Sequence, residues 1–169
     1  VVYHWYNNEN PELMPDLFFS EYLDGSGLNN AIIITNRTGN PVDLDQYGIV
    51  YSYNGGAVTG PVQISGIVKL SNDDSWMIIN PSFNVSAIDA SAVDASISSV
   101  TAFDGNDALA LVKIYASGTK YRIVDRIGVL SVNPGTGWAV AGIPGATKDK
   151  RLVRKASVIK GQPDWMRSA

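Results

Sequence analysis

Short runs of apolar and β-branched residues alternate with turn-forming residues along the whole chain. The runs are rich in Ile, Val, Tyr and Thr, and the segments between them contain Gly, Pro, Asn and Asp, as in Asn54-Gly55-Gly56. Short strands separated by such turns are typical of a β-sandwich or barrel. We expect strands over residues 17–23, 31–36, 48–53, 63–70, 75–80, 108–115, 121–127 and 151–156.

Two of these segments have the character of covered strands. Residues 31–34 are apolar throughout. Residues 108–115 carry only Ala, Val and Ile on one face, and the other face mixes apolar and long amphipathic side chains: Leu109, Leu111, Lys113 and Tyr115. Such strands are covered on both faces, so we expect them at the centre of their sheets. Residues 86–96 contain Ala, Ser and Asp instead. Ser and Asp favour caps and turns over helix interiors, so we expect a loop there with at most a single helical turn.

Length and composition favour one globular domain. A chain of 169 residues can bury a sizeable core, and its 45% hydrophobic and 17% charged residues exclude a disordered chain. No apolar run approaches the roughly 20 residues that cross a bilayer, so we expect no membrane insertion. The chain has no Cys, which excludes disulfide bonds and thiolate metal sites.

Charge is distributed unevenly along the chain, although the net charge is only −3. Residues 1–107 carry 13 acidic and 2 basic residues, whereas residues 108–169 carry 3 acidic and 11 basic ones. A basic tail can attract nucleic acid or another anionic polymer. The opposite charges can instead lie on neighbouring strands or facing subunits and steer association. The basic run has no interleaved aromatic residues, which argues against nucleic acid.

Six groups of residues form an ordered series of motifs. They are Ser20-Glu21-Tyr22 with Gly25-Ser26 and Asn29-Asn30, Val42-Asp43-Leu44 with Tyr47, residues 103–111, residues 125–128, residues 134–138, and residues 152–155. Together they resemble the extracellular bacterial form of the lamin tail domain, over residues 16 to 165. The resemblance implies an all-β, immunoglobulin-like β-sandwich. It also implies an extracellular or cell-surface module that binds, anchors or assembles and is not an enzyme.

The chain departs from that family at two places. Members carry a Glu in the second strand, where this chain has Ile33, so a polar or metal site does not carry over there. Members also continue beyond the motif at Asp164-Trp165 into one more strand, which this sequence lacks at its usual place. We therefore expect one margin of the sandwich to need another strand, because an open edge exposes unpaired N–H and C=O groups.

The first six residues are the candidate for that strand. Val1, Val2, Tyr3, His4, Trp5 and Tyr6 are β-branched or aromatic and strongly strand-forming. The linker that follows, residues 7–15, contains Pro11 and Pro15 and spans at most ~30 Å. The strand can fill the margin of its own chain, fill that of a neighbouring copy by donor-strand complementation, or merely pack on the sheet edge at an arbitrary chain boundary. The sequence leaves these three alternatives open.

No catalytic constellation stands out. His4 is the single His and lies between Tyr3 and Trp5, where a packed residue is more common than a base. Nucleophile-elbow, phosphate-loop and paired-His zinc motifs are absent from the sequence. Glu21 with Asp24, or Asp104 with Asp107, could form the carboxylate pair of a glycosidase, but no substrate groove can be inferred. We expect no enzymatic activity.

Calcium is the main candidate among ligands. Asp104, Asn106 and Asp107 offer three oxygen donors around Gly105, and Ca²⁺ binds hard oxygen ligands of this kind. The alternative is that these side chains form hydrogen bonds to nearby backbone, as Asp and Asn do in turns. Exposed aromatic residues are a second possibility, for glycan binding. Trp76 and Trp138 fit core positions, so Trp5 and Trp165 are the predicted surface aromatics.

These observations predict an N-terminal strand and linker over residues 1–15 and a lamin-tail-like β-sandwich over residues 16–169. The predicted function is that of a structural or interaction module. It is expected to be a self-assembling surface or filament subunit joined by its N-terminal strand, with other copies of itself or other surface proteins as partners. The alternative is a calcium-, glycan- or polymer-binding accessory domain of a larger secreted bacterial protein.

Overall fold

The structure is a computed structural model that describes residues 15–115, 117–118 and 120–169. Strands make up most of its regular structure, and the described helices are short. The all-β class predicted from the sequence is therefore confirmed. Helical residues are confined to single turns: η1 (Leu44–Gln46), η2 (Val85–Ala87), η3 (Ala90–Ala92), α1 (Ser98–Thr101) and α2 (Trp165–Ser168).

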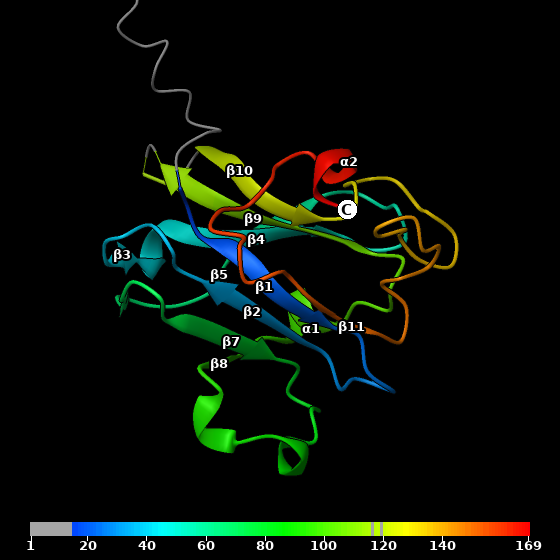
Figure 1. Ribbon diagram of the computed structural model, residues 1–169, viewed down its shortest axis with the longest axis horizontal. Helices are drawn as coiled ribbons and strands as arrows, with labels where there is room; N and C mark the ends of the chain where they lie inside the picture. Colours follow the sequence, from blue (N-terminus) through cyan, green and yellow to red (C-terminus); the bar gives the residue numbers. More distant parts are fainter. Residues whose placement is uncertain (1–14, 116, 119) are drawn as a thin grey trace, which may run out of the picture.

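Eleven described strands form three sheets. The five-stranded sheet has the order β11 (Arg151–Val153), β1 (Phe18–Leu23), β2 (Ala31–Thr35), β7 (Ser75–Ile79) and β8 (Ala95–Ser96). The four-stranded sheet has the order β10 (Lys120–Ile127), β9 (Ala108–Tyr115), β4 (Tyr47–Ser52) and β5 (Thr59–Gln63). Strands β3 (Val42–Asp43) and β6 (Lys69–Leu70) pair separately. The two larger sheets lie one over the other, and α2 lies near β10 (Figure 1).

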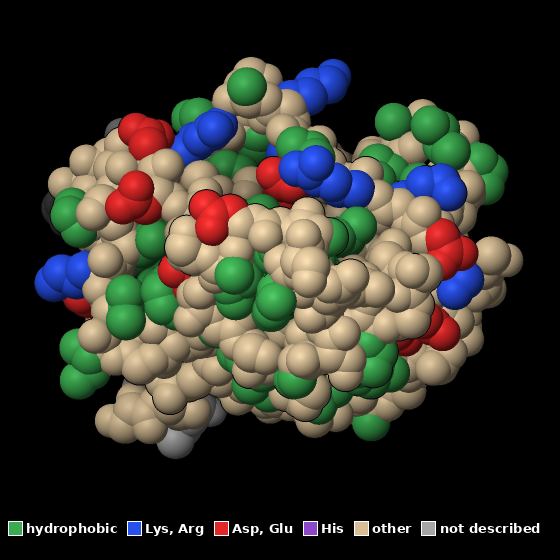
Figure 2. Space-filling view, turned by 90° about the horizontal axis from the view of Figure 1, so that it is seen from below, with side chains coloured by type: hydrophobic (Ala, Val, Ile, Leu, Met, Phe, Trp, Pro, Cys, Tyr) green, Lys and Arg blue, Asp and Glu red, His purple; other side chains and the backbone are tan. Residues whose placement is uncertain are grey.

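Basic side chains are concentrated on part of the surface. Figure 2 shows Lys and Arg side chains mainly along the upper margin of the face that it presents and none across its lower third. Two ion pairs join the acidic and basic parts of the sequence: Arg122 binds Asp16, and Arg151 binds Glu21, each with an N–O distance of 2.6 Å. Opposite charges thus meet within one molecule, and these pairs fasten β1 to β10 and to β11.

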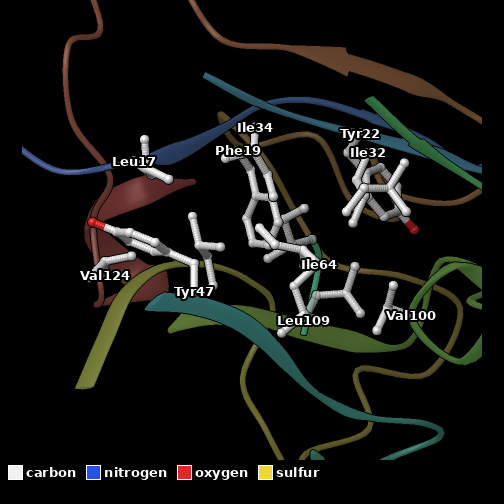
Figure 3. Packing of buried hydrophobic residues seen from close by; sticks show 14 of the residues in the cluster. Leu17, Phe19, Tyr22, Ile32, Ile34, Tyr47, Ile64, Val100, Leu109 and Val124 are labelled. Atoms are coloured by element: carbon white, nitrogen blue, oxygen red, sulfur yellow. The ribbon is translucent and has the colours of Figure 1, made fainter. Parts of the chain in front are cut away.

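The hydrophobic core lies between the two larger sheets. Phe19, Ile32 and Ile34 contribute from the five-stranded sheet, and Tyr47 and Leu109 from the four-stranded one. Figure 3 shows these side chains converging from the two sides. All are nearly inaccessible to solvent, with at most 2% exposed. Since burial of apolar surface is the main favourable term in folding, this shared core holds the two sheets together.

The central strands are those that the sequence predicts. β2 lies in the middle of its sheet and β9 is buried over its first five residues. The prediction of one strand over residues 63–70 is wrong, because β5 ends at Gln63 and β6 covers only Lys69–Leu70. The start of β5 was missed because its Gly60-Pro61 reads as a turn, whereas Pro is tolerated on an edge strand.

Residues 84–96 form a regular ladder of turns, more than the single turn expected. Asn84 and Asp89 each accept a hydrogen bond from the backbone N–H two residues later, which caps η2 and η3. Asp94 stands at the next position of this five-residue period. Ile88 and Val93 pack against the small cluster around Phe83. The ladder projects beyond β7 and β8 in Figure 1.

Candidate interaction groove at the β11 margin

Asp16, which follows the N-terminal segment, is bonded to several parts of the described structure. Asp16 accepts a hydrogen bond from the Tyr47 hydroxyl and another from the Leu17 N–H, and it pairs with Arg122. Its neighbour Pro15 is exposed. The predicted assembly strand (Val1, Val2, Tyr3, His4, Trp5 and Tyr6) lies outside the described residues, and so does most of its linker.

β11 leaves one side of its backbone without a strand partner among the described residues. It pairs only with β1, in the register Glu21 with Val153 and Leu23 with Arg151. Arg154 N–H donates to Ser20 O, so the even-numbered residues direct their N–H and C=O groups toward β1. In an antiparallel ladder these groups alternate in direction. Arg151 and Val153 therefore direct their N–H and C=O groups outward.

A groove of about 410 Å³ lies beside this strand. Its lining comes from β1, β11, α2, the end of β10 and the turn around Val140: Phe19, Ser20, Glu21, Tyr22, Ile127, Val140, Ala141, Leu152, Val153, Arg154, Lys155, Val158, Trp165, Ser168 and Ala169. Most of these side chains are apolar. Among the lining residues, Val153 is 58% exposed, and Val140, Leu152 and Val158 are partly exposed. The groove thus combines an open sheet edge with accessible apolar surface.

A buried carboxylate organises one side of the groove. Asp125 is fully buried and accepts hydrogen bonds from Phe19 N–H at 2.8 Å and Gln162 N–H at 2.9 Å. It also pairs with Arg154 at 2.7 Å, and Arg154 donates to Phe19 O and Ser168 Oγ. Burial raises the pKa of the Asp125 carboxyl group, while Arg154 and the backbone N–H groups oppose that shift. Asp125 thereby joins the two sheets and the C-terminal tail.

Local irregularities in two strands produce this arrangement. The register of β1 shifts between Phe19 and Glu21, and that of β10 shifts between Ile123 and Asp125. Bulges of this kind redirect side chains and interrupt the ladder. The shift in β1 lies beside the Phe19 N–H, which donates to Asp125 across the two sheets. Sequence reasoning missed this cluster. Its available signal was Asp125, an acidic residue in a strand that is otherwise apolar or basic.

The predicted surface position of Trp165 is wrong. Trp165 is 7% exposed and belongs to the core, where its ring meets that of Trp138 edge to face at 6.2 Å. Asp164 caps α2 by accepting from Met166 N–H, which directs Trp165 inward. Position near a chain end suggested exposure, whereas the short α2 turn buries the ring under the groove. Trp5 lies outside the described residues.

The loop proposed for calcium uses its oxygen atoms for structure. Asp107 is 4% exposed and accepts from Asn54 N–H and Asp104 N–H, one bond on each carboxylate oxygen. Asn106 donates to Asn54 Oδ1, and its own Oδ1 is buried without a partner. Over residues 15–115, 117–118 and 120–169, no group of three His, Cys, Asp or Glu side chains is arranged to hold a metal ion. The loop therefore follows the alternative that the sequence offered, side chains bonded to backbone.

Comparisons with family models, curated proteins and solved structures found no match. Within the part of the chain that the structure describes, none of the helices has the length and apolar character needed to cross a bilayer.

Proposed function

We propose that this chain is a non-enzymatic structural or interaction module that assembles with copies of itself through residues 1–6. Its architecture is taken to be the immunoglobulin-like sandwich of lamin tail domains, and its place of action outside the cell or at the cell surface. The observation that carries the proposal is the open β11 margin, where an unpartnered strand edge adjoins an accessible apolar groove. Edges of this kind are sites of strand addition.

The arm, defined as residues 1–14, can join copies in two ways. It precedes Asp16, whose carboxylate binds residues of β4 and β10. The groove is lined by β1 residues that closely follow Asp16, and by β11 and α2. If each arm enters the groove of a different copy, the contact is heterologous and gives a ring or an open filament. Two copies that exchange arms form a closed dimer instead.

Native mass tests this function. The full chain and a variant lacking residues 1–14 are compared by sedimentation velocity over a hundredfold concentration range. We expect the full chain to associate and the shortened one to stay monomeric with the same far-UV circular dichroism. A full-length variant with Tyr3→Ser and Trp5→Ser should behave like the shortened chain, and its matched control, Asn7→Ser and Asn8→Ser, like the unchanged one. Identical masses for all four proteins would refute self-assembly.

A further inference from the structure

We infer that the groove beside β11 is the receiving site of this assembly and that residues 1–6 of a second copy occupy it as an added strand. The inference rests on the proposed function and specifies which surface accepts the arm. Three independent features of the described residues support it: the direction of the free backbone groups, the apolar lining of the groove, and the charge at its rim.

The backbone of β11 offers a complete hydrogen-bonding edge to an incoming strand. The outward N–H and C=O groups of Arg151 and Val153 follow from the register with β1. A segment of six residues covers this edge with residues to spare, since β11 itself has three. Strand addition uses these main-chain groups for affinity and pockets beside the edge for specificity.

The side-chain pattern of the arm matches the two sides of that edge. In a strand, Val1, Tyr3 and Trp5 lie on one face, and Val2, His4 and Tyr6 on the other. None of the side chains in the first set ionises near neutral pH, so this set suits the apolar groove. There the side chains would meet the partly exposed apolar residues of the lining, Val140, Leu152 and Val158, whereas Phe19, Tyr22, Ile127 and Trp165 of the same lining are buried. The second set would face outward, beside Arg151 and Val153.

The positive charge at the rim of the groove is complementary to the negative charge of the linker, residues 7–15. Lys155 lines the groove, and Arg167 belongs to α2, which contributes its neighbour Ser168 to the lining. Within the described residues, neither side chain makes an ion pair. The arm carries Glu9 and Glu12 and no Lys or Arg. Complementary charges of this kind steer association and fix its register.

The arm is assigned to a neighbouring copy because of its linker. Pro11 and Pro15 favour an extended backbone at the residues that precede them. A return to β11 of the same molecule would require the chain to reverse direction within residues 7–15. An extended linker, which spans at most ~30 Å, reaches outward instead.

The first test removes one of the two outward N–H groups of β11, that of Val153, without disturbing the pairing of β11 with β1. Val153→Pro does this, because the Val153 N–H faces away from β1 and Pro is tolerated at such edge positions. Val153→Thr keeps the N–H and is the matched control. A fluorescent peptide of residues 1–14 is titrated into the body lacking residues 1–14. We expect saturable binding that Val153→Pro weakens at least tenfold and Val153→Thr leaves within about twofold.

The second test asks whether the arm and the groove act between molecules. Full-length Val153→Pro retains its arm but has a blocked groove, and the body lacking residues 1–14 has a groove but no arm. Each should be monomeric alone, and an equimolar mixture should form a one-to-one complex. Lys155→Glu combined with Arg167→Glu should weaken this complex at low salt and lose its effect near 1 M salt. Lys120→Glu, at the opposite end of β10, should leave it unchanged.

The outcomes separate this inference from the proposed function. If arm-dependent association persists at full strength in Val153→Pro, the groove is not the receiving site, although self-assembly stands. If the full chain is monomeric and binds no peptide until residues 1–14 are removed, the arm occupies its own groove, and transfer to a second copy is refuted. If no association depends on the arm at all, both the inference and the proposed function fail.

Discussion

At the β8 margin of the five-stranded sheet, groups next to the edge strand bond the neighbouring strand β7, whereas the β11 margin adjoins an apolar groove. Asp94 occupies both backbone groups of Met77, since its carboxylate accepts from Met77 N–H and its own N–H donates to Met77 O. Ile97 N–H, just after β8, donates to Ile79 O. On the other side, Arg151 and Val153 have no such caps among the described residues. One sheet thus ends at one margin in a two-residue strand flanked by these bonds, and at the other in β11 beside the groove.

The difference shows how a β-protein limits strand addition to one place. Natural sheets protect their edges with short strands, charges and covering loops. The β8 margin has a short strand, the two-residue β8, and a charge, the Asp94 carboxylate. The turns of residues 84–96 lie next to it. At the other margin the buried Asp125 cluster keeps the groove in shape without covering the edge. Substitutions at the β11 margin should therefore change both stability and association, and those at the β8 margin stability alone.

Loss of the Asp125 carboxylate should be the most damaging change. Asp125→Ala leaves Arg154 and the Phe19 and Gln162 N–H groups without their buried partner. Removing one member of a buried ion pair costs about 3–5 kcal/mol, so the free energy of unfolding should fall by this amount in urea. The control is Asp43→Ala, which breaks the exposed pair with Lys69 and should cost less than about 1 kcal/mol. Equal losses would show that the cluster contributes no more than a surface pair.

A methyl group at Gly161 should displace the tail that frames the groove. A Cβ there would lie 2.5 Å from Val124 O and 2.5 Å from Asp125 Cβ. Overpacking of this kind costs about 1–3 kcal/mol, and Gly161→Ala should also weaken binding of the arm. Gly66→Ala is the matched control, because its Cβ would meet no atom within 4 Å. Thermal unfolding of both variants checks the prediction, which is contradicted if the two melting temperatures agree.

The sequence predicted the strands of the core better than it predicted the margins. Residues 31–34 are apolar throughout and 108–112 carry only apolar residues, and the structure places them centrally in β2 and β9. Such a pattern is local, so the sequence shows it directly. β8 and β5 are short edge strands, and their Ser, Gly and Pro content does not predict a strand.

The candidate site was predictable only in part. The aromatic character of residues 1–6 was read from the sequence, whereas the expectation that one margin needs a strand came from the resemblance to lamin tail domains. The Asp125 cluster was not, because it joins residues 19, 125, 154 and 162 through two register shifts. Trp165 was misplaced for a similar reason, since the turn that buries it depends on the Asp164 cap. Contacts between distant segments leave no periodic signal.

At the β8 margin, removal of the Asp94 cap should have a moderate effect on stability and none on association. Asp94→Ala deprives the exposed Met77 N–H of its acceptor, and loss of a single hydrogen bond costs about 0.5–1.5 kcal/mol. Asp89→Ala, one step earlier in the ladder, removes the acceptor of the Ser91 N–H and hydroxyl but of no strand residue, and should change the unfolding midpoint less. Sedimentation velocity should give the wild-type association for both. Arm-independent association of Asp94→Ala would show that this cap is what keeps the margin closed.

Calcium should have the smallest effect, because the Asp107 carboxylate and two carbonyl groups of the loop at Asp104 already accept hydrogen bonds. Both Asp107 carboxylate oxygens accept N–H groups, and Thr147 and Trp138 hold the Gly105 and Asp107 carbonyls at 2.6 and 2.8 Å. A ligand that binds only the folded state raises the melting temperature with its concentration. Millimolar Ca²⁺ and excess chelator should therefore give the same melting temperature, in the full chain and in the body without residues 1–14. If calcium raises the melting temperature and Asp104→Asn abolishes that rise, the accessory-domain alternative is favoured. The functional site would then be this loop and not the β11 margin.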